Sequence, residues 1–422
     1  MVMLDPQGDF FNEGGVKVAL EEIPAEIRKS LNLAWFQGIE AQDTFPGTII
    51  RLPLRTERHR SKIATKTISC QEIEGHFQTF VEKEMDICLL FLSSLRSVEF
   101  WVIREGETIP SRIAMSSIAP TIGASSDGTA LSSRVETKLY SNPSHGKDWL
   151  IQWHSVPDSE SQGQLSTRID YDAKSTMEAE KLTATVALAI HTDVSQDESR
   201  ASGRLFTYLP LPSDTNYPCN IHAPFALTID RQTLRNEKED GLIKGSDDQC
   251  VFPTRILARI DSLYRSIRVE WNRYLFDILI PMAWATLLFD LSKRNLTLFS
   301  AWPSTQHVSI GCSYWQGVPE EALRQIMDNN VSVWPVRGSS TPLTHHRYEE
   351  VLVAPPDITV TLLDAFTSIG LIVTQPPQEV YNLTRTVRRD RLLTPELVHT
   401  TILVRLGNFY LGVFLLTSLR LI

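Results

Sequence analysis

Few residues in this sequence stand at spacings that support a known chemistry. The doublet His345 and His346 is adjacent, whereas an H-E-x-x-H metal site needs two histidines one helical turn apart. Cys70, His76 and Cys88 lack the spacing of a closed zinc site and have no fourth ligand. No Walker A loop and no G-x-S-x-G elbow is present. The sequence therefore predicts no self-contained active site and no metal site.

Composition restricts the class of protein. The chain has 422 residues, which predicts about three domains, and its 42% hydrophobic and 22% charged residues are typical of globular proteins. With 41 basic and 50 acidic residues the formal charge is −9, so no nucleic-acid partner is expected. The five cysteines are widely spaced without a C-x-x-C pair, and the N-terminus has no secretory pattern. These features predict a cytoplasmic protein, with the nucleus as the alternative.

Two apolar stretches bear on membrane association. Residues 278–289 are too few to cross a bilayer, so we expect a buried core helix kinked at Pro281. Residues 401–422 are longer but contain Arg405 and Gly412, and a buried strand or helix is favoured over a membrane span. A membrane partner is therefore not expected.

Periodicity predicts alternating strands and helices, which defines an α/β chain. Strand patterns occupy residues 48–56, 98–103, 149–156, 181–191 and 203–209. Helical patterns occupy residues 73–95 and 254–291. Polar stretches at 116–144 and 155–167 predict loops, and the prolines at 210–212 predict a turn. Beyond residue 292 the pattern becomes mixed and more helical.

Three stretches together resemble a known family. They are residues 45–56 (FPGTIIRLPLRT) preceded by Leu4-Asp5-Pro6, residues 203–212 (GRLFTYLPLP) leading into 220–234 (NIHAPFALTIDRQTL), and residues 269–272 (VEWN). In this order and spacing they resemble the sacsin-type repeat module, over residues 4 to roughly 382. That module is similar to the N-terminal and middle domains of the ninety-kilodalton heat-shock chaperones, which are GHKL-class ATPases.

The resemblance implies a domain organisation. Residues 1–58 would be the C-terminal remnant of a GHKL ATPase sheet, so the chain is expected to be N-terminally truncated. Residues 59–250 would form the middle α/β domain, and residues 251–395 a mixed, mostly helical domain. Residues 396–422 form an apolar segment that departs from the family pattern near Arg405 and is expected to be aberrant.

The resemblance also implies an incomplete ATP site. The E-x-x-x-N helix and the D-x-G-x-G turn of the GHKL fold are absent from this sequence. Gly47 and Thr48 match the Gly-Thr that opens the last strand of that fold, where the threonine can hydrogen-bond beside the adenine. An ordinary strand entry is the alternative. ATP and Mg are thus expected in the intact parent only, and no cofactor is expected for this chain alone.

Arg231 is the candidate catalytic residue. It stands in an L-x-I-x-R-x-x-L pattern that resembles the middle-domain catalytic loop of these chaperones, whose arginine reaches the γ-phosphate. A guanidinium is permanently charged and can bind phosphate oxygens bidentately. An exposed or salt-bridged structural arginine is the alternative, and Arg204 and Arg235 match the pattern less well. Trp271 and Asn272 are expected to be architectural, because Trp271 lies on the apolar stripe of its helix.

The predicted function is that of a fragment of a sacsin-like, ATP-dependent chaperone or protein-quality-control factor. Its partners would be client proteins or other chaperones, and the chain alone is expected to be inactive as an ATPase. The alternative is a non-catalytic protein-interaction module.

Overall fold

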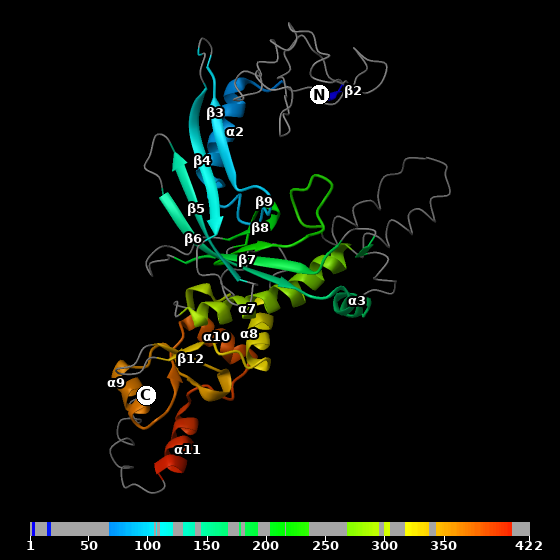
Figure 1. Cartoon of the computed structure of the whole chain (residues 1–422). Coiled ribbons are helices and arrows are strands. Elements are labelled where there is room, and N and C mark those ends of the chain that lie inside the picture. Colours follow the sequence, from blue (N-terminus) through cyan, green and yellow to red (C-terminus); the bar gives the residue numbers. More distant parts are fainter. Residues whose placement is uncertain are drawn as a thin grey trace. The chain divides into compact units, whose positions relative to one another are not determined.

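The computed structural model describes residues 2–4, 15–17, 67–104, 107, 110–120, 130–139, 145–167, 177–178, 182–192, 203–215, 217–235, 268–294, 299–303, 317–336 and 343–406 (Figure 1). The chain divides into two compact units. The first comprises Met1–Lys83, Val98–Met115 and Lys138–Pro143, and the second comprises Glu84–Ser97, Ser116–Thr137 and Ser144–Ile422.

The first unit contains one described helix and a small sheet. Its elements are β1 (Val2–Leu4), which pairs antiparallel with β2 (Gly15–Lys17), α2 (Cys70–Lys83), and β3 (Ser97–Val102) from Val98 onward. A capping box starts α2, because Glu72 donates its backbone N–H to Ser69 Oγ and Ser69 donates its own to Glu72 Oε2. Phe77 and Phe80 then pack against Phe100 of β3, with ring centroids 5.5 and 5.6 Å apart.

The second unit is organised around a mixed sheet. The strand order is β4-β5-β6-β7-β10-β8-β9. These strands are β4 (Ser111–Pro120, from Ser116 in this unit), β5 (Ala130–Leu139), β6 (His145–Ser155), β7 (Thr185–His191), β8 (Arg204–Thr207), β9 (Leu209–Asp214) and β10 (Asn220–His222). β10 pairs parallel with β8 and antiparallel with β7. Ala187, Leu188 and Ala189 are fully buried, so β7 is covered on both faces.

One long helix packs against this sheet. It runs through residues 268–274, a π-helical turn η4 (Leu275–Leu279) and α7 (Ile280–Lys293), which covers part of β6 and β7 (Figure 1). Ile280 donates its backbone N–H to the carbonyl of Leu275, five residues earlier. Pro281 follows and has no N–H to continue the usual pattern, so the wide turn lies directly before the proline.

The same helix is the candidate for a membrane span among the described residues, and most of it is buried in the protein. Among them, Arg268–Lys293 is the one helix long and apolar enough to cross a membrane, and 72% of its most apolar window is buried inside the protein. Trp284 illustrates the packing, because its ring lies 5.1 Å from that of Tyr217 and its Nε1 donates to the carbonyl of Ala301 at 2.9 Å. This burial agrees with the core helix predicted at 278–289.

Short elements complete the second unit. They are α3 (Asp158–Ser166), η5 (Phe299–Ala301), α8 (Val318–Asp328), β11 (Trp334–Val336), β12 (Thr344–His346), η7 (Tyr348–Glu350), β13 (Leu352–Val353), α9 (Val360–Ser368), β14 (Val373–Thr374), α10 (Gln378–Val387) and α11 (Pro395–Leu406). The large core around Trp271 and Trp284 extends to Trp302 and Trp334, whose rings are 4.8 Å apart. A smaller core centred on Phe366 lies between α9, β13 and β14.

The predicted α/β class is confirmed. The strands expected at 98–103, 149–156, 181–191 and 203–209 correspond to β3, β6, β7 and β8. The helix expected at 73–95 is shorter, since α2 ends at Lys83 and turns follow. The strand expected at 48–56 lies outside the described residues.

The loop predicted at 116–144 is wrong where the structure describes it. β4 continues to Pro120 and β5 spans Ala130–Leu139. The buried face of β5 carries the small polar residues Ser133 and Thr137, and the Thr137 hydroxyl lies 3.3 Å from that of Ser116 in β4. Hydroxyls that satisfy one another across strands make a polar stretch compatible with a sheet.

Two further polar or proline-rich stretches differ from expectation. The loop predicted at 155–167 contains α3, in which Leu165 is fully buried. The turn predicted at the prolines 210–212 lies inside β9. Since β9 is the last strand of the sheet, Pro210 and Pro212 need no N–H for a further neighbour.

Candidate functional site

The loop that carries Arg231 is short and closed at its base. Leu227 and Leu234 form an isolated antiparallel bridge, and between them the Thr228 N–H donates to the Thr233 carbonyl at 3.0 Å. A turn then forms because the Arg231 N–H donates to the Thr228 carbonyl at 2.9 Å. The six residues 228–233 therefore protrude as a defined turn.

Arg231 occupies the outer part of this loop. Its φ is 57°, in the left-handed region that side chains other than glycine rarely adopt. Its side chain is exposed and forms no hydrogen bond or ion pair with the residues that the structure describes. The guanidinium is thus uncommitted within that part of the chain.

Asp230 stiffens the loop from inside. Its carboxylate accepts hydrogen bonds from the Thr228 hydroxyl and, at 3.1 Å, from the backbone N–H of Gln232. These two bonds lower the pKa of Asp230, the hydroxyl contributing most. The carboxylate is therefore ionised and bonded to its own loop.

Asn272 holds both ends of the loop. It is fully buried, and its Oδ1 accepts from the N–H of Ala226 at 2.9 Å. Its Nδ2 donates to the carbonyl of Ala226 at 2.9 Å and to the carbonyl of Arg235 at 3.2 Å. One side chain thereby ties the residue before the loop and the residue after it to the long helix.

Trp271 fixes the approach to the loop. Its ring is fully buried, and its Nε1 donates to the carbonyl of Pro224 at 2.9 Å. The architectural role expected for Trp271 and Asn272 is confirmed by this burial. The clamp that Asn272 forms was not predicted, although an asparagine beside an apolar stripe was a signal, because a buried amide needs several partners.

Four other residues were considered for the site in the sequence analysis. Gly47 and Thr48 lie outside the described residues. Arg204 of β8 forms ion pairs, with its guanidinium 3.1 Å from the carboxylate of Glu84 and 3.3 Å from that of Asp214. Arg235 contributes its carbonyl to the Asn272 clamp.

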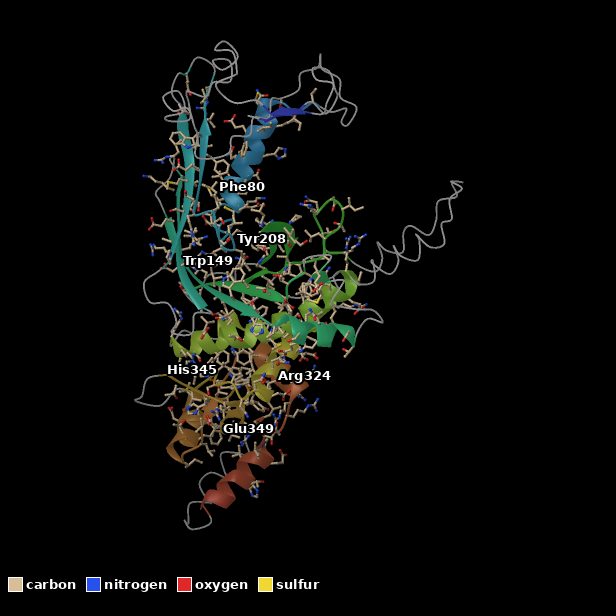
Figure 2. The ribbon with its side chains drawn as sticks, turned by 45° about the vertical axis from the view of Figure 1, so that its right-hand side comes forward. Phe80, Trp149, Tyr208, Arg324, His345 and Glu349 are labelled. Carbon is tan, nitrogen blue, oxygen red and sulfur yellow. The ribbon has the colours of Figure 1, made fainter. Side chains whose placement is uncertain are left out.

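A neutral histidine supports the strands that lead to the loop. Tyr208 lies at the turn between β8 and β9 (Figure 2) with φ of 65°, and its N–H donates to His222 Nδ1 at 3.2 Å. Burial lowers the pKa of His222 to about 4, and Phe91 stacks on its ring at 5.2 Å. His222 is therefore an uncharged residue of the core, and its Nδ1 also lies 3.2 Å from the carbonyl oxygen of Phe206.

The possible metal ligands of the described residues are not clustered. Among the described residues, no group of three or more His, Cys, Asp or Glu side chains is placed to hold a metal ion. His345 and His346 lie side by side on β12, and His346 instead pairs with Glu350 at 3.4 Å.

Comparison with known proteins shows which family of modules this chain resembles. The family model of the Sacsin domain matches residues 1–115. Human sacsin is 24% identical over 381 residues, covering 78% of this chain but 8% of sacsin, so the chain spans less than a tenth of its relative's length. No solved structure matches the chain significantly. The chain carries a sacsin-like module, as its motifs predicted. The Arg231 loop lies beyond the residues that the family model matches.

Proposed function

We propose that this chain is part of a sacsin-like, ATP-dependent chaperone or protein-quality-control factor. In this proposal residues 1–58 belong to the end of a GHKL-type ATPase domain, residues 59–250 form a chaperone-like middle domain, and residues 251–395 form a mixed, mostly helical domain. The intact parent binds ATP with Mg and acts on client proteins or with other chaperones in the cytoplasm. Arg231 is the residue that reaches the γ-phosphate.

The observation that carries this proposal is the state of the Arg231 loop. The guanidinium is exposed and has no partner within the described residues, while the backbone beneath it is held by Asp230 and Asn272. A permanently charged arginine without a competing partner fits a phosphate group, and because its backbone is already held, only the side chain has to be ordered on binding. ATP would supply the transferable phosphoryl group, which Arg231 would contact; Thr48 would hydrogen-bond beside the adenine, and Gly47 would permit close approach of the backbone.

The test uses a polypeptide in which an intact ATP-binding half precedes this chain. Arg231→Ala is expected to lower the ATP turnover number by about two orders of magnitude, as loss of a transition-state charge contact does, with little change in ATP affinity. Turnover is followed by phosphate release, and affinity by calorimetry. Arg324→Ala, which removes an exposed arginine from α8, is the matched control and should change neither quantity.

Equal losses of turnover and affinity, or no loss, would contradict a γ-phosphate role. No loss of either quantity would favour the alternative of a non-catalytic interaction module. One observation supports that alternative: Ile229, two residues before Arg231, is 95% exposed, so the loop presents an apolar side chain at its tip.

A further inference from the structure

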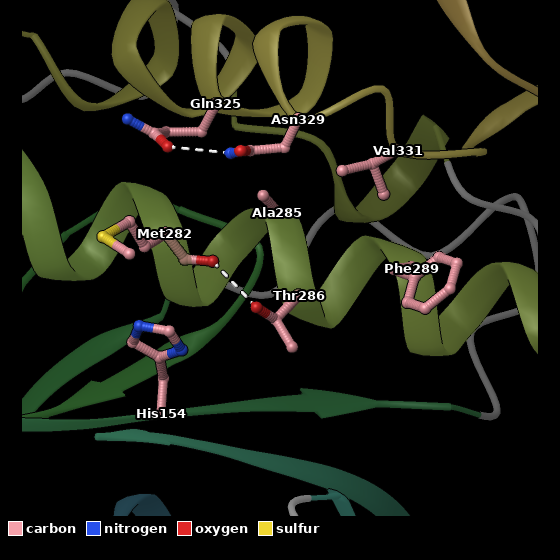
Figure 3. A pocket seen from close by; sticks show the side chains of 8 residues that line it. All are labelled: His154, Met282, Ala285, Thr286, Phe289, Gln325, Asn329 and Val331. Carbon is pink, nitrogen blue, oxygen red and sulfur yellow. Dashed lines mark hydrogen bonds between the residues drawn. The ribbon is translucent and has the colours of Figure 1, made fainter. Parts of the chain in front are cut away.

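A pocket of about 220 Å³ lies in the second unit where β6, α7 and α8 meet (Figure 3). His154 of β6 forms one side, and Met282, Thr286 and Phe289 of α7 form the middle. Figure 3 shows the imidazole extending from the strand toward α7, on the side where Met282 and Thr286 project. The wall is built on a sheet and two packed helices, so its backbone frame exists before any ligand arrives, whereas side chains such as Met282 can still move.

The wall carries no charged side chain. At the end of α8, Gln325 and Asn329 are polar, and one N–H of each amide is already bonded, because Gln325 donates to Glu321 and Asn329 donates to Gln325, each at 3.1 Å. Thr286 donates its hydroxyl hydrogen to the carbonyl of Met282 at 3.0 Å. The pocket therefore offers apolar surface and neutral polar groups, and it has no counter-charge for an ion.

His154 supplies the polar group without a partner. Its Nε2 is buried and forms no hydrogen bond in the part of the chain that the structure describes. Burial lowers the pKa of His154, and the more distant charge of Glu160 opposes this effect. A neutral imidazole carries one N–H and one lone pair, so a ligand hydroxyl can bond to Nε2 in either tautomer once a neighbouring side chain moves to expose this atom. Met282 is flexible and can shift to admit such a group.

The volume of the pocket fits a ligand with a single ring. A dry engineered cavity of about 150 Å³ holds benzene, whereas pockets for larger drug-like ligands begin at about 300 Å³. At about 220 Å³, this pocket lies between these limits. A ring with one or two small substituents fills it.

We propose that this pocket binds a small, uncharged aromatic molecule carrying one hydroxyl, with the ring between α7 and α8 and the hydroxyl hydrogen-bonded to His154. This site is independent of the proposed role of Arg231 in nucleotide turnover.

The test compares p-cresol with toluene, which has the same ring and methyl group but no hydroxyl. Methyl labelling of the seven methionines of the full chain provides Met282 as a reporter in the wall. p-Cresol is expected to shift the Met282 resonance saturably and to bind about 3- to 10-fold more tightly than toluene, the gain of one hydrogen bond. His154→Phe should lower the affinity for p-cresol to that for toluene and leave the affinity for toluene unchanged.

Controls separate the site from general effects. His346→Phe alters another histidine outside the pocket and should leave both affinities unchanged. Thr286→Leu fills the pocket from a half-buried position and should abolish both. The buried methionines Met85, Met177 and Met327 report whether each variant keeps its fold. The absence of saturable shifts at Met282, or equal affinities for p-cresol and toluene in the unaltered chain, would overturn the proposal.

Discussion

The side chain of Asn272 pairs with both backbone groups of Ala226, accepting from its N–H and donating to its carbonyl, each at 2.9 Å. This is the pairing that a neighbouring strand would make, supplied here by one buried amide. Because Asn272 also bonds the carbonyl of Arg235, the loop between these two residues is anchored at both ends. Asn272 thus couples the long helix to the position of Arg231.

Removing this amide should loosen the loop and destabilise the second unit. Asn272→Ala removes three hydrogen bonds at the loop base and leaves the buried N–H of Ala226 without its acceptor, so we expect the free energy of unfolding to fall by about 3 kcal/mol. Urea unfolding followed by tryptophan fluorescence measures this change. Asn382→Ala on the exposed face of α10 is the matched control and should cost no more than about 0.5 kcal/mol. A similar small cost at both sites would show that the clamp is unimportant.

Two glycines should respond oppositely to the same substitution. A Cβ on Gly203, at the start of the GRLF motif, would lie 1.8 Å from the backbone carbonyl oxygen of Cys219, so Gly203→Ala should cost about 3 kcal/mol or more. A Cβ on Gly163 in α3 would meet nothing within 4 Å, so Gly163→Ala should stabilise by up to about 1 kcal/mol. Thermal unfolding of the two variants checks the contrast. Tolerance of Gly203→Ala would mean that β8 and the Cys219 segment are not packed this closely.

His222 should make stability depend on pH. Its pKa in the folded chain is about 4, below the ordinary value of 6.5, so the unfolded chain binds this proton first as the pH falls. The contribution to stability is complete above pH 6.5, declines as the pH falls toward 4, and then levels off. At about 1.4 kcal/mol per pH unit, the loss across this window is about 3 kcal/mol.

The measurement is urea unfolding at several pH values for the parent chain and for His222→Asn. Asparagine keeps an acceptor near the N–H of Tyr208 but does not titrate. The free energy of unfolding should therefore depend less steeply on pH between 6.5 and 4 in the variant than in the parent chain. Parallel pH profiles for the two proteins would contradict a buried neutral His222.

The strands that could be predicted from sequence are those with apolar or β-branched residues on the buried face. β7 is an example, since its residues from Val186 to Ile190 are all buried. β5 could not be predicted in this way, because Ser133 and Thr137 replace apolar residues on its buried face. For Thr137, compatibility with the sheet depends on Ser116, a residue of another strand.

The candidate site was predictable only in part. The L-x-I-x-R-x-x-L pattern located Arg231, and the VEWN motif located the buried pair Trp271 and Asn272. The hydrogen bonds that join these two motifs cross 46 positions of sequence, and no local pattern encodes them. The pocket beside His154 is still less visible, since β6, α7 and α8 contribute to it from distant parts of the chain.

The π-helical turn before Pro281 has a consequence for both sites at once. Asn272 precedes the turn and Met282 follows it, so the extra residue in the turn sets the angle between the face that holds the loop and the face that lines the pocket. One residue of an α-helix corresponds to a rotation of about 100°. The wide turn takes up this residue locally. If the turn became regular α-helix at the same chain length, the pocket face would rotate by about this angle relative to the loop face, and the chain could satisfy the loop or the pocket but not both.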